Sequence, residues 1–161
     1  MHGPRYKVAF RRRREGVTDY SHRLKLVKSG TARAVVRKTN RYCTVQFIEF
    51  GDSGDRVLAS ASSIELRKYG WKGAASNSAA AYLTGMLAAK RASKHGVTDA
   101  ILDAGMISPS RNSGVYAALC GMLEAGLEIP HGDETKVPDE RIESLAKEHG
   151  NMSEIKTKLV K

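Results

Sequence analysis

The first residues whose types and spacing could do chemistry form a basic segment with aromatic rings near the amino terminus. Four consecutive arginines, residues 11–14, lie among Tyr6, Phe10 and Tyr20. Guanidinium groups bind phosphate oxygens in pairs, and aromatic rings stack on unpaired bases. This pattern predicts binding to nucleic acid, although Tyr20 could instead pack a short helix against the core.

The positive charge of the chain is confined to one end. The 161 residues carry a net charge of +10, which is large for this size and indicates a polyanionic partner. Residues 1–41 hold thirteen of the 27 Lys and Arg residues but two of the 17 acidic ones, so the remaining 120 residues are nearly neutral. An excess at one end predicts a dedicated polyanion-binding appendage, with a solvated tail as the alternative.

Residues that could support catalysis are scattered. Cys43 and Cys120 lie far apart and form no CxxC pair, so free thiols in a reducing cytoplasm are expected. None of the five histidines belongs to a nucleophile motif such as GxSxG. The glycines of Gly70-Trp71-Lys72-Gly73 do not match a phosphate-binding loop and predict a strand-to-helix turn. We expect no enzyme activity, cofactor, metal or small-molecule substrate.

Hydrophobic patterning predicts the elements that position the basic segment. Tyr20, Leu24 and Val27 recur at helical spacing after a candidate cap at Thr18, and Gly30 ends that helix. Strand-like runs follow at residues 33–39, 42–50 and 56–61, with a tight turn at 40–41 and a looser one at 51–55. These runs predict a three-strand antiparallel meander.

The second half of the chain predicts a helix, a strand and another helix, at residues 78–95, 97–104 and 113–125. Residues 62–71 fit no element clearly. Together with the meander, this order predicts an α/β fold with a mixed sheet covered by helices. We divide the chain into a basic arm with a short helix (1–30), a core domain (31–130) and an acidic extension (131–161). The extension is expected to contain a short helix bracketed by Pro138 and Gly150, and its final eleven residues are expected to be frayed.

Targeting or membrane segments are not expected. No stretch approaches the roughly 18 consecutive apolar residues of a membrane span, and the start lacks the apolar region of a signal peptide. The expectation is a soluble, cytoplasmic protein.

A metal-dependent nuclease is the main enzymatic alternative, because ribonuclease-H-like domains share this order of elements. Such enzymes need carboxylates that converge on two metal ions, starting in the first strand. The first strand here contains none, and Asp99 and Asp103 alone cannot hold two metals. A generic basic nucleic-acid-binding or chromatin protein is the alternative of another class.

Several motifs are distinctive in combination: Gly3-Pro4-Arg5-Tyr6, Phe10-Arg11-Arg12-Arg13-Arg14-Glu15-Gly16, Thr18-Asp19-Tyr20, Glu65-Leu66-Arg67-Lys68-Tyr69-Gly70-Trp71-Lys72-Gly73 and Gly126-Leu127-Glu128-Ile129-Pro130-His131-Gly132. Over about residues 3–143 the chain resembles the archaeal large-subunit ribosomal protein L-eighteen family, whose eukaryotic relatives are called ribosomal protein L-five. From Ser144 onward the match weakens.

The resemblance implies a protein of the large ribosomal subunit that binds 5S ribosomal RNA. It implies attachment of that RNA to the large (23S-type) ribosomal RNA, beside neighbouring ribosomal proteins of the central protuberance. It also implies a core of the ribonuclease-H-like motif, shared with ribosomal protein S-eleven and lacking the catalytic carboxylates. The residues expected to contact RNA are Arg5, Tyr6, Lys7, Phe10, Arg11, Arg12, Arg13, Arg14, Tyr20, Arg23, Lys28, Arg33, Arg37, Lys38, Arg41, Arg67, Lys68, Tyr69, Trp71, Lys72, Arg111 and Asn112. The last two could bind a phosphate at the start of a helix.

Overall fold

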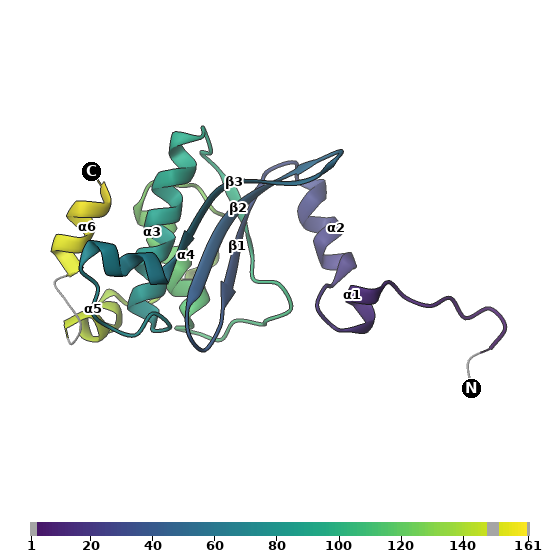
Figure 1. Cartoon of the computed structure of the whole chain (residues 1–161), viewed down its shortest axis with the longest axis horizontal. Coiled ribbons are helices and arrows are strands. Elements are labelled where there is room, and N and C mark those ends of the chain that lie inside the picture. The colour runs from purple at the N-terminus through teal and green to yellow at the C-terminus, as the bar shows by residue number, and fades with distance from the viewer. Residues whose placement is uncertain (1–2, 148–151, 161) are drawn as a thin grey trace.

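A four-stranded mixed sheet organises the computed structural model of the chain, which describes residues 3–147 and 152–160 (Figure 1). The strand order is β3-β2-β1-β4. The first three strands form the predicted antiparallel meander, and β4 joins β1 in parallel after a helical crossover. The strands are β1 (Ala32–Lys38), β2 (Cys43–Gly51), β3 (Gly54–Ser62) and β4 (Ala100–Asp103). The predicted α/β fold with a mixed sheet is confirmed.

The two faces of the sheet differ because side chains alternate along each strand. Ala34 and Val36 of β1 are fully buried on one face, where they belong to the apolar core. Helices α3 (Ser78–Lys94) and α4 (Gly114–Glu124) cover this face. Arg33 and Arg37 point to the opposite face, where a short helix near the amino terminus lies (Figure 1).

Helices α3 and α4 pack closely because glycines lie at their contact. A Cβ atom added to Gly85 of α3 would lie 2.1 Å from the carbonyl oxygen of Ala118. One added to Gly121 of α4 would lie 2.0 Å from the carbonyl oxygen of Tyr82. Any larger side chain at either glycine would push the two helix backbones apart.

The acidic extension completes the core instead of trailing away from it. Helices α5 (Asp139–Lys147) and α6 (Met152–Val160) pack against α3. Ile155 and Leu159 of α6 are buried, and the Lys156 ammonium lies 4.8 Å from the centre of the Tyr82 ring. The expectation of frayed residues at this end is therefore wrong for residues 152–160, because the buried Ile155 and Leu159 and the half-buried Met152 dock this helix on the core.

Two further segments differ from expectation. Residues Ser63–Tyr69, within the stretch 62–71 that fitted no element clearly, form a 3₁₀ helix, η1, begun by a capping box between Ser62 and Glu65. The turn expected to be loose is tight, because β2 and β3 stay paired as far as Gly51 and Gly54.

A second short 3₁₀ helix, η2, spans Asp133–Thr135.

On the other face of the sheet lies α2 (Tyr20–Lys28), which follows the single turn of α1 (Arg11–Arg14). The cap of α2 is Asp19 and not Thr18. The Asp19 carboxylate accepts hydrogen bonds from the backbone N–H groups of Ser21 and His22 at 2.9 and 3.1 Å. These hydrogen bonds lower the pKa of Asp19, the one from His22 most strongly.

Candidate nucleic-acid interface

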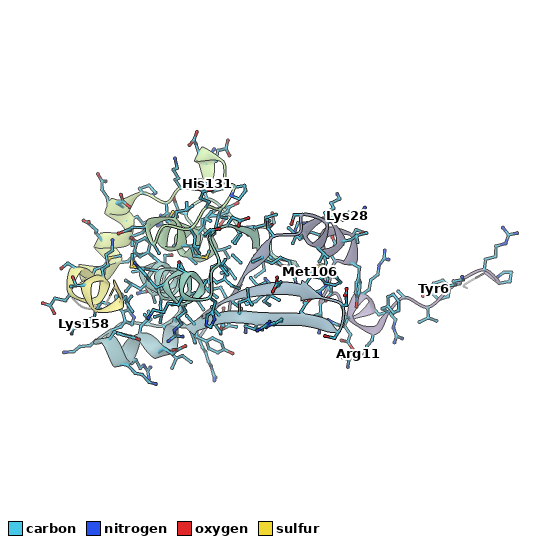
Figure 2. The ribbon with its side chains drawn as sticks, turned by 90° about the horizontal axis from the view of Figure 1, so that it is seen from above. Tyr6, Arg11, Lys28, Met106, His131 and Lys158 are labelled. Atoms are coloured by element: carbon cyan, nitrogen blue, oxygen red, sulfur yellow. The ribbon has the colours of Figure 1, made fainter. Side chains whose placement is uncertain are left out.

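The basic arm, residues 3–17, projects from the folded core with nearly all its side chains in solvent. Only Ala9 is half-buried, and the other fourteen residues are exposed. Figure 2 shows Tyr6 and Arg11 on the segment that extends away from the sheet. The arm therefore presents rings and cations to a partner without contributing to the apolar core.

Helix α1 gathers the four consecutive arginines on a single turn. Two of them make local contacts: Arg12 Nε donates to the Thr18 hydroxyl at 2.9 Å, and Arg11 lies 3.9 Å from the Glu15 carboxylate. Exposed pairs of this kind are weak in water. A phosphate can therefore replace them at small cost.

A ring contact joins the arm to α2. The rings of Phe10 and Tyr20 lie 5.7 Å apart, centre to centre, at an angle of 52°. Phe10 is 75% exposed and Tyr20 36%, so both rings keep surface free for a base. Tyr20 does not pack into the core, which was its alternative role. Base stacking by these rings stays a prediction.

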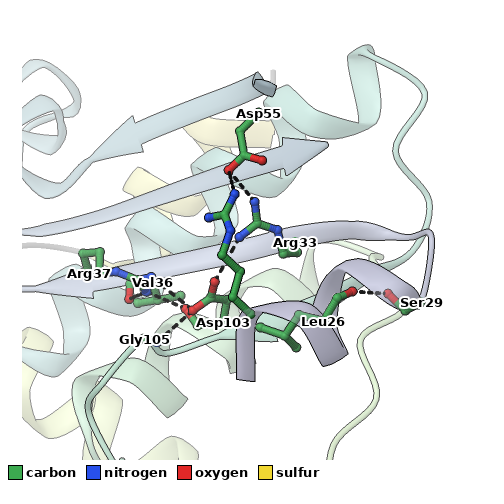
Figure 3. A network of polar contacts seen from close by, with 9 residues as sticks. Leu26, Ser29, Arg33, Val36, Arg37, Asp55, Asp103 and Gly105 are labelled. Carbon is green, nitrogen blue, oxygen red and sulfur yellow. Dashed lines mark hydrogen bonds and ion pairs between the residues drawn. The ribbon is translucent and has the colours of Figure 1, made fainter. Parts of the chain in front are cut away.

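Helix α2 is connected to the sheet by five alternating charges, which we call the arginine–aspartate network: Arg23, Asp55, Arg33, Asp103 and Arg37. Figure 3 labels the four members that come from the sheet strands. Asp55 Oδ2 accepts from Arg23 at 2.6 Å and from Arg33 at 2.7 Å. Asp103 accepts from Arg33 at 3.4 Å and from Arg37 at 3.1 Å. The network lines a cavity of about 360 Å³ between α2 and the sheet.

Asp55 stays ionised within this network although it is partly withdrawn from water. Burial raises its pKa, but hydrogen bonds from Arg23 and Arg33 and the charges of both arginines more than compensate. The net effect is a pKa below the usual value for aspartate.

Two predicted RNA contacts need correction because the structure buries them. Arg33 is 3% exposed, and its guanidinium is held between two carboxylates of the protein itself. Trp71 is 2% exposed and belongs to the apolar core, where its indole N–H faces the carbonyl oxygen of Ala74. Neither side chain can reach an RNA in this conformation.

The predicted cations around η1 form a separate group. Arg67, Lys68 and Lys72 are exposed, and Tyr69 is half-buried. Helix η1 packs against α3 and α6, which lie on the side of the sheet opposite to α2 (Figure 1). The structure therefore does not bring this group together with the arm.

A third group lies where the turn after β1 meets the starts of α3 and α4. Lys38 and Asn112 line one cavity of about 530 Å³ there, together with the cap residues Asn77 and Ser113. Arg111 instead approaches Glu134 at 3.4 Å on the surface, where both side chains are more than three-quarters exposed. Arg41 is exposed in the turn between β1 and β2.

The sequence analysis did not predict Asp55 and Asp103 as partners of the arginines. The sequence contains a signal for such partners, because Arg33 and Arg37 are four residues apart on one strand and so share one face of the sheet. Two arginines on one strand face need carboxylate partners if that face is covered.

Within residues 3–147 and 152–160, no three His, Cys, Asp or Glu side chains lie close enough together to hold a metal ion. In the same residues, no helix is both long enough and apolar enough to cross a membrane.

Comparison with known proteins gives consistent matches. Residues 4–100 match the family described as ribosomal large subunit proteins 60S L5 and 50S L18. The chain is similar to large ribosomal subunit protein uL18 of Korarchaeum cryptofilum, with 56% identity over 147 residues, 88% of this chain and 75% of the relative. The uL18 of Methanothermobacter thermautotrophicus is 55% identical, covering 86% of this chain and 72% of the relative. That of Haloarcula marismortui is 51% identical, covering 82% and 71%.

Proposed function

The chain belongs to the family of ribosomal large-subunit proteins 60S L5 and 50S L18, and from this premise we propose that it binds 5S ribosomal RNA. Membership makes it a structural constituent of the large ribosomal subunit and not an enzyme. The proposal adds that it attaches 5S ribosomal RNA to the large-subunit ribosomal RNA in the central protuberance, beside neighbouring ribosomal proteins.

One observation carries the proposal: the exposed arm that combines four arginines of α1 with the rings of Tyr6 and Phe10. Cations bind the phosphates of a nucleic acid whatever its sequence, whereas aromatic rings stack only on bases that are unpaired. Structured RNA with loops and bulges offers phosphates and unpaired bases, whereas a regular DNA duplex offers phosphates but no unpaired bases. The arm therefore suits a folded RNA better than a DNA duplex.

A competition experiment tests the proposal. Full-length protein is bound to labelled 5S ribosomal RNA at moderate salt, and excess duplex DNA or unlabelled 5S ribosomal RNA is added. We expect the RNA to compete and the DNA to compete weakly. Equal competition by DNA would indicate a general basic binder, and magnesium-dependent cleavage of the RNA would indicate an enzyme.

Deletion of residues 1–17 tests the role assigned to the arm. Because residues 3–17 bury no side chain, the shortened protein is expected to fold. It is also expected to lose most of its affinity for 5S ribosomal RNA in a filter-binding assay. A folded shortened protein that binds as tightly as the full chain would refute this role.

A further inference from the structure

We propose that Asp55 and Asp103 are positioning residues for RNA binding, which hold α2 and the attached arm in a fixed orientation on the sheet. The inference rests on the proposed function and deepens it. Both residues are acidic and carry charge of the sign that RNA repels. Their contribution to binding would therefore be indirect, through the arginines that they hold.

Helix α2 has little apolar contact to keep it in place. Leu26 is its only buried residue, and the helix spans nine residues. Isolated helices of this length are marginal in water and need packing against the rest of a protein. Tyr20 and Leu24, two of the residues at helical spacing, remain exposed. Polar contacts must therefore supply much of what holds α2.

The arginine–aspartate network supplies those contacts. Arg23 comes from α2, Asp55 from β3, Arg33 from β1 and Asp103 from the end of β4. The Arg33 guanidinium is 3% exposed and is held by a carboxylate on each side, so it can turn toward neither solvent nor RNA. A charge buried in this way is strongly destabilised when one partner is removed. Loss of Asp55 would disconnect α2 from Arg33.

Asp103 is itself fixed in position. Its Oδ1 atom accepts from the backbone N–H of Gly105 at 2.8 Å as well as from Arg37 at 3.1 Å. Arg37 also donates to the carbonyl oxygens of Asp103 and Val36, at 2.7 and 2.9 Å. The network is thus anchored at β4 and reaches α2 through Arg33 and Asp55.

Positioning and simple repulsion predict opposite changes in the affinity for structured RNA when Asp55 is neutralised. If Asp55 only repels phosphates, Asp55→Asn would tighten binding to every RNA. If it positions α2, the same change would weaken binding to structured RNA, because Arg23 and the arm lose their fixed orientation. Attraction to an unstructured polyanion would be kept, since the cations remain.

The test compares Asp55→Asn with Asp52→Asn in the full chain. Asp52 lies three residues before Asp55, in the turn between β2 and β3, and is exposed, so both variants lose one negative charge in one region. Dissociation constants are measured for 5S ribosomal RNA and for polyuridylate at one salt concentration. We expect Asp55→Asn to weaken 5S binding about tenfold or more and to leave polyuridylate binding unchanged or tighter. Asp52→Asn should weaken binding to neither RNA. Asp55→Glu, which keeps a carboxylate, should recover part of the lost 5S affinity.

Hydrogen exchange without RNA separates this proposal from the proposed function. In wild-type protein the backbone amides of α2, such as Arg23 N–H bonded to the Asp19 carbonyl oxygen, should be protected. In Asp55→Asn this protection should fall while that of β2 and α3 is retained. Should Asp55→Asn unfold the sheet, Arg23→Gln, which leaves the Arg33–Asp55 pair in place, is used instead.

The possible outcomes are distinct. Failure of the wild type to bind 5S ribosomal RNA would refute the proposed function while the exchange data still test the docking of α2. Unchanged α2 protection, or tighter 5S binding by Asp55→Asn, would overturn the positioning role.

Discussion

One arginine, Arg91, chiefly sets the lowered pKa of the Glu65 carboxyl. Arg91 of α3 donates to the Glu65 carboxylate at 2.7 Å and is the main reason that the pKa of Glu65 lies below its usual value. The same contact raises the pKa of Arg91. Glu65 also accepts from the backbone N–H of Ser62, so one side chain both begins η1 and joins it to α3.

The lowered pKa of Glu65 predicts loss of stability in acid. A carboxylate whose pKa is lower in the folded state stabilises the protein above its unfolded pKa, near 4.5, and loses that contribution as the pH falls through the folded value. We expect the free energy of unfolding, measured by urea denaturation, to fall between pH 5 and pH 3, and to fall less in Glu65→Gln. Asp52→Asn serves as an exposed control and should follow the wild type. Identical pH profiles for Glu65→Gln and wild type would contradict the prediction.

Cys43 should be chemically inert in the folded protein. Burial raises the pKa of its thiol to about 11, against a small opposite effect of Lys38, and the side chain is fully buried in the core. The thiolate is the reactive form. Iodoacetamide at pH 8.5 should therefore leave Cys43 unmodified, and denaturant should make it reactive, as read by mass spectrometry of the Cys43 peptide. Equal modification rates in the two conditions would show that the core opens readily.

At the scale of elements, the contact between α3 and α4 depends on the absence of a side chain at two positions. Gly85→Ala would place a methyl group 2.1 Å from a backbone oxygen of the neighbouring helix. Overpacking of this kind costs about 1–3 kcal/mol. We expect that loss in the free energy of unfolding by urea denaturation. Gly132→Ala is the control, because a Cβ there meets nothing within 4 Å. An unchanged free energy of unfolding in Gly85→Ala would mean that the two helices can move apart without cost.

Elements with strong local patterns could be predicted from the sequence, and those that depend on distant contacts could not. Runs rich in β-branched and aromatic residues between turn residues identified β1 and β2. An apolar stripe after a cap at Ser76, Asn77 or Ser78 identified α3, and the structure shows that the cap is Asn77. Helix α6 is short and was expected to be frayed, and its burial depends on a surface formed by α3 and η1. The tight turn between β2 and β3 depends on pairing that continues to Gly51, which composition does not reveal.

At the scale of the whole molecule, the candidate site could be predicted only in part. The arm was visible as a local excess of charge with rings. The arginine–aspartate network was not, because it joins residues on α2, β1, β3 and β4 that meet only when the sheet is assembled. Burial of Arg33 likewise depends on Asp55 and Asp103, which lie 22 and 70 positions further along the chain.

Because the cations are concentrated in the arm, we expect the arm to control how the affinity for 5S ribosomal RNA depends on salt concentration. Each phosphate contact contributes roughly 0.7–0.9 to the slope of log affinity against log salt concentration. Replacing the four arginines of α1 by glutamine should reduce the slope for 5S ribosomal RNA by about 2–4 while the far-UV circular dichroism of the core is kept. Lys158→Gln, on exposed α6 surface, should leave the slope unchanged. An unaltered slope in the four-arginine variant would place the phosphate contacts elsewhere.

The arginine–aspartate network also has a consequence for the order of events during folding. Arg33 and Asp103 are 70 positions apart, and closing so long a loop is slower than forming the hairpins among β1, β2 and β3. Helix α2 thus has no complete docking surface until β4 has joined the sheet. A refolding chain carries its cations from the start, so weak attraction to any RNA precedes oriented contact. If α2 is held by this network as we propose, the fixed orientation of α2 indicates that the sheet is complete.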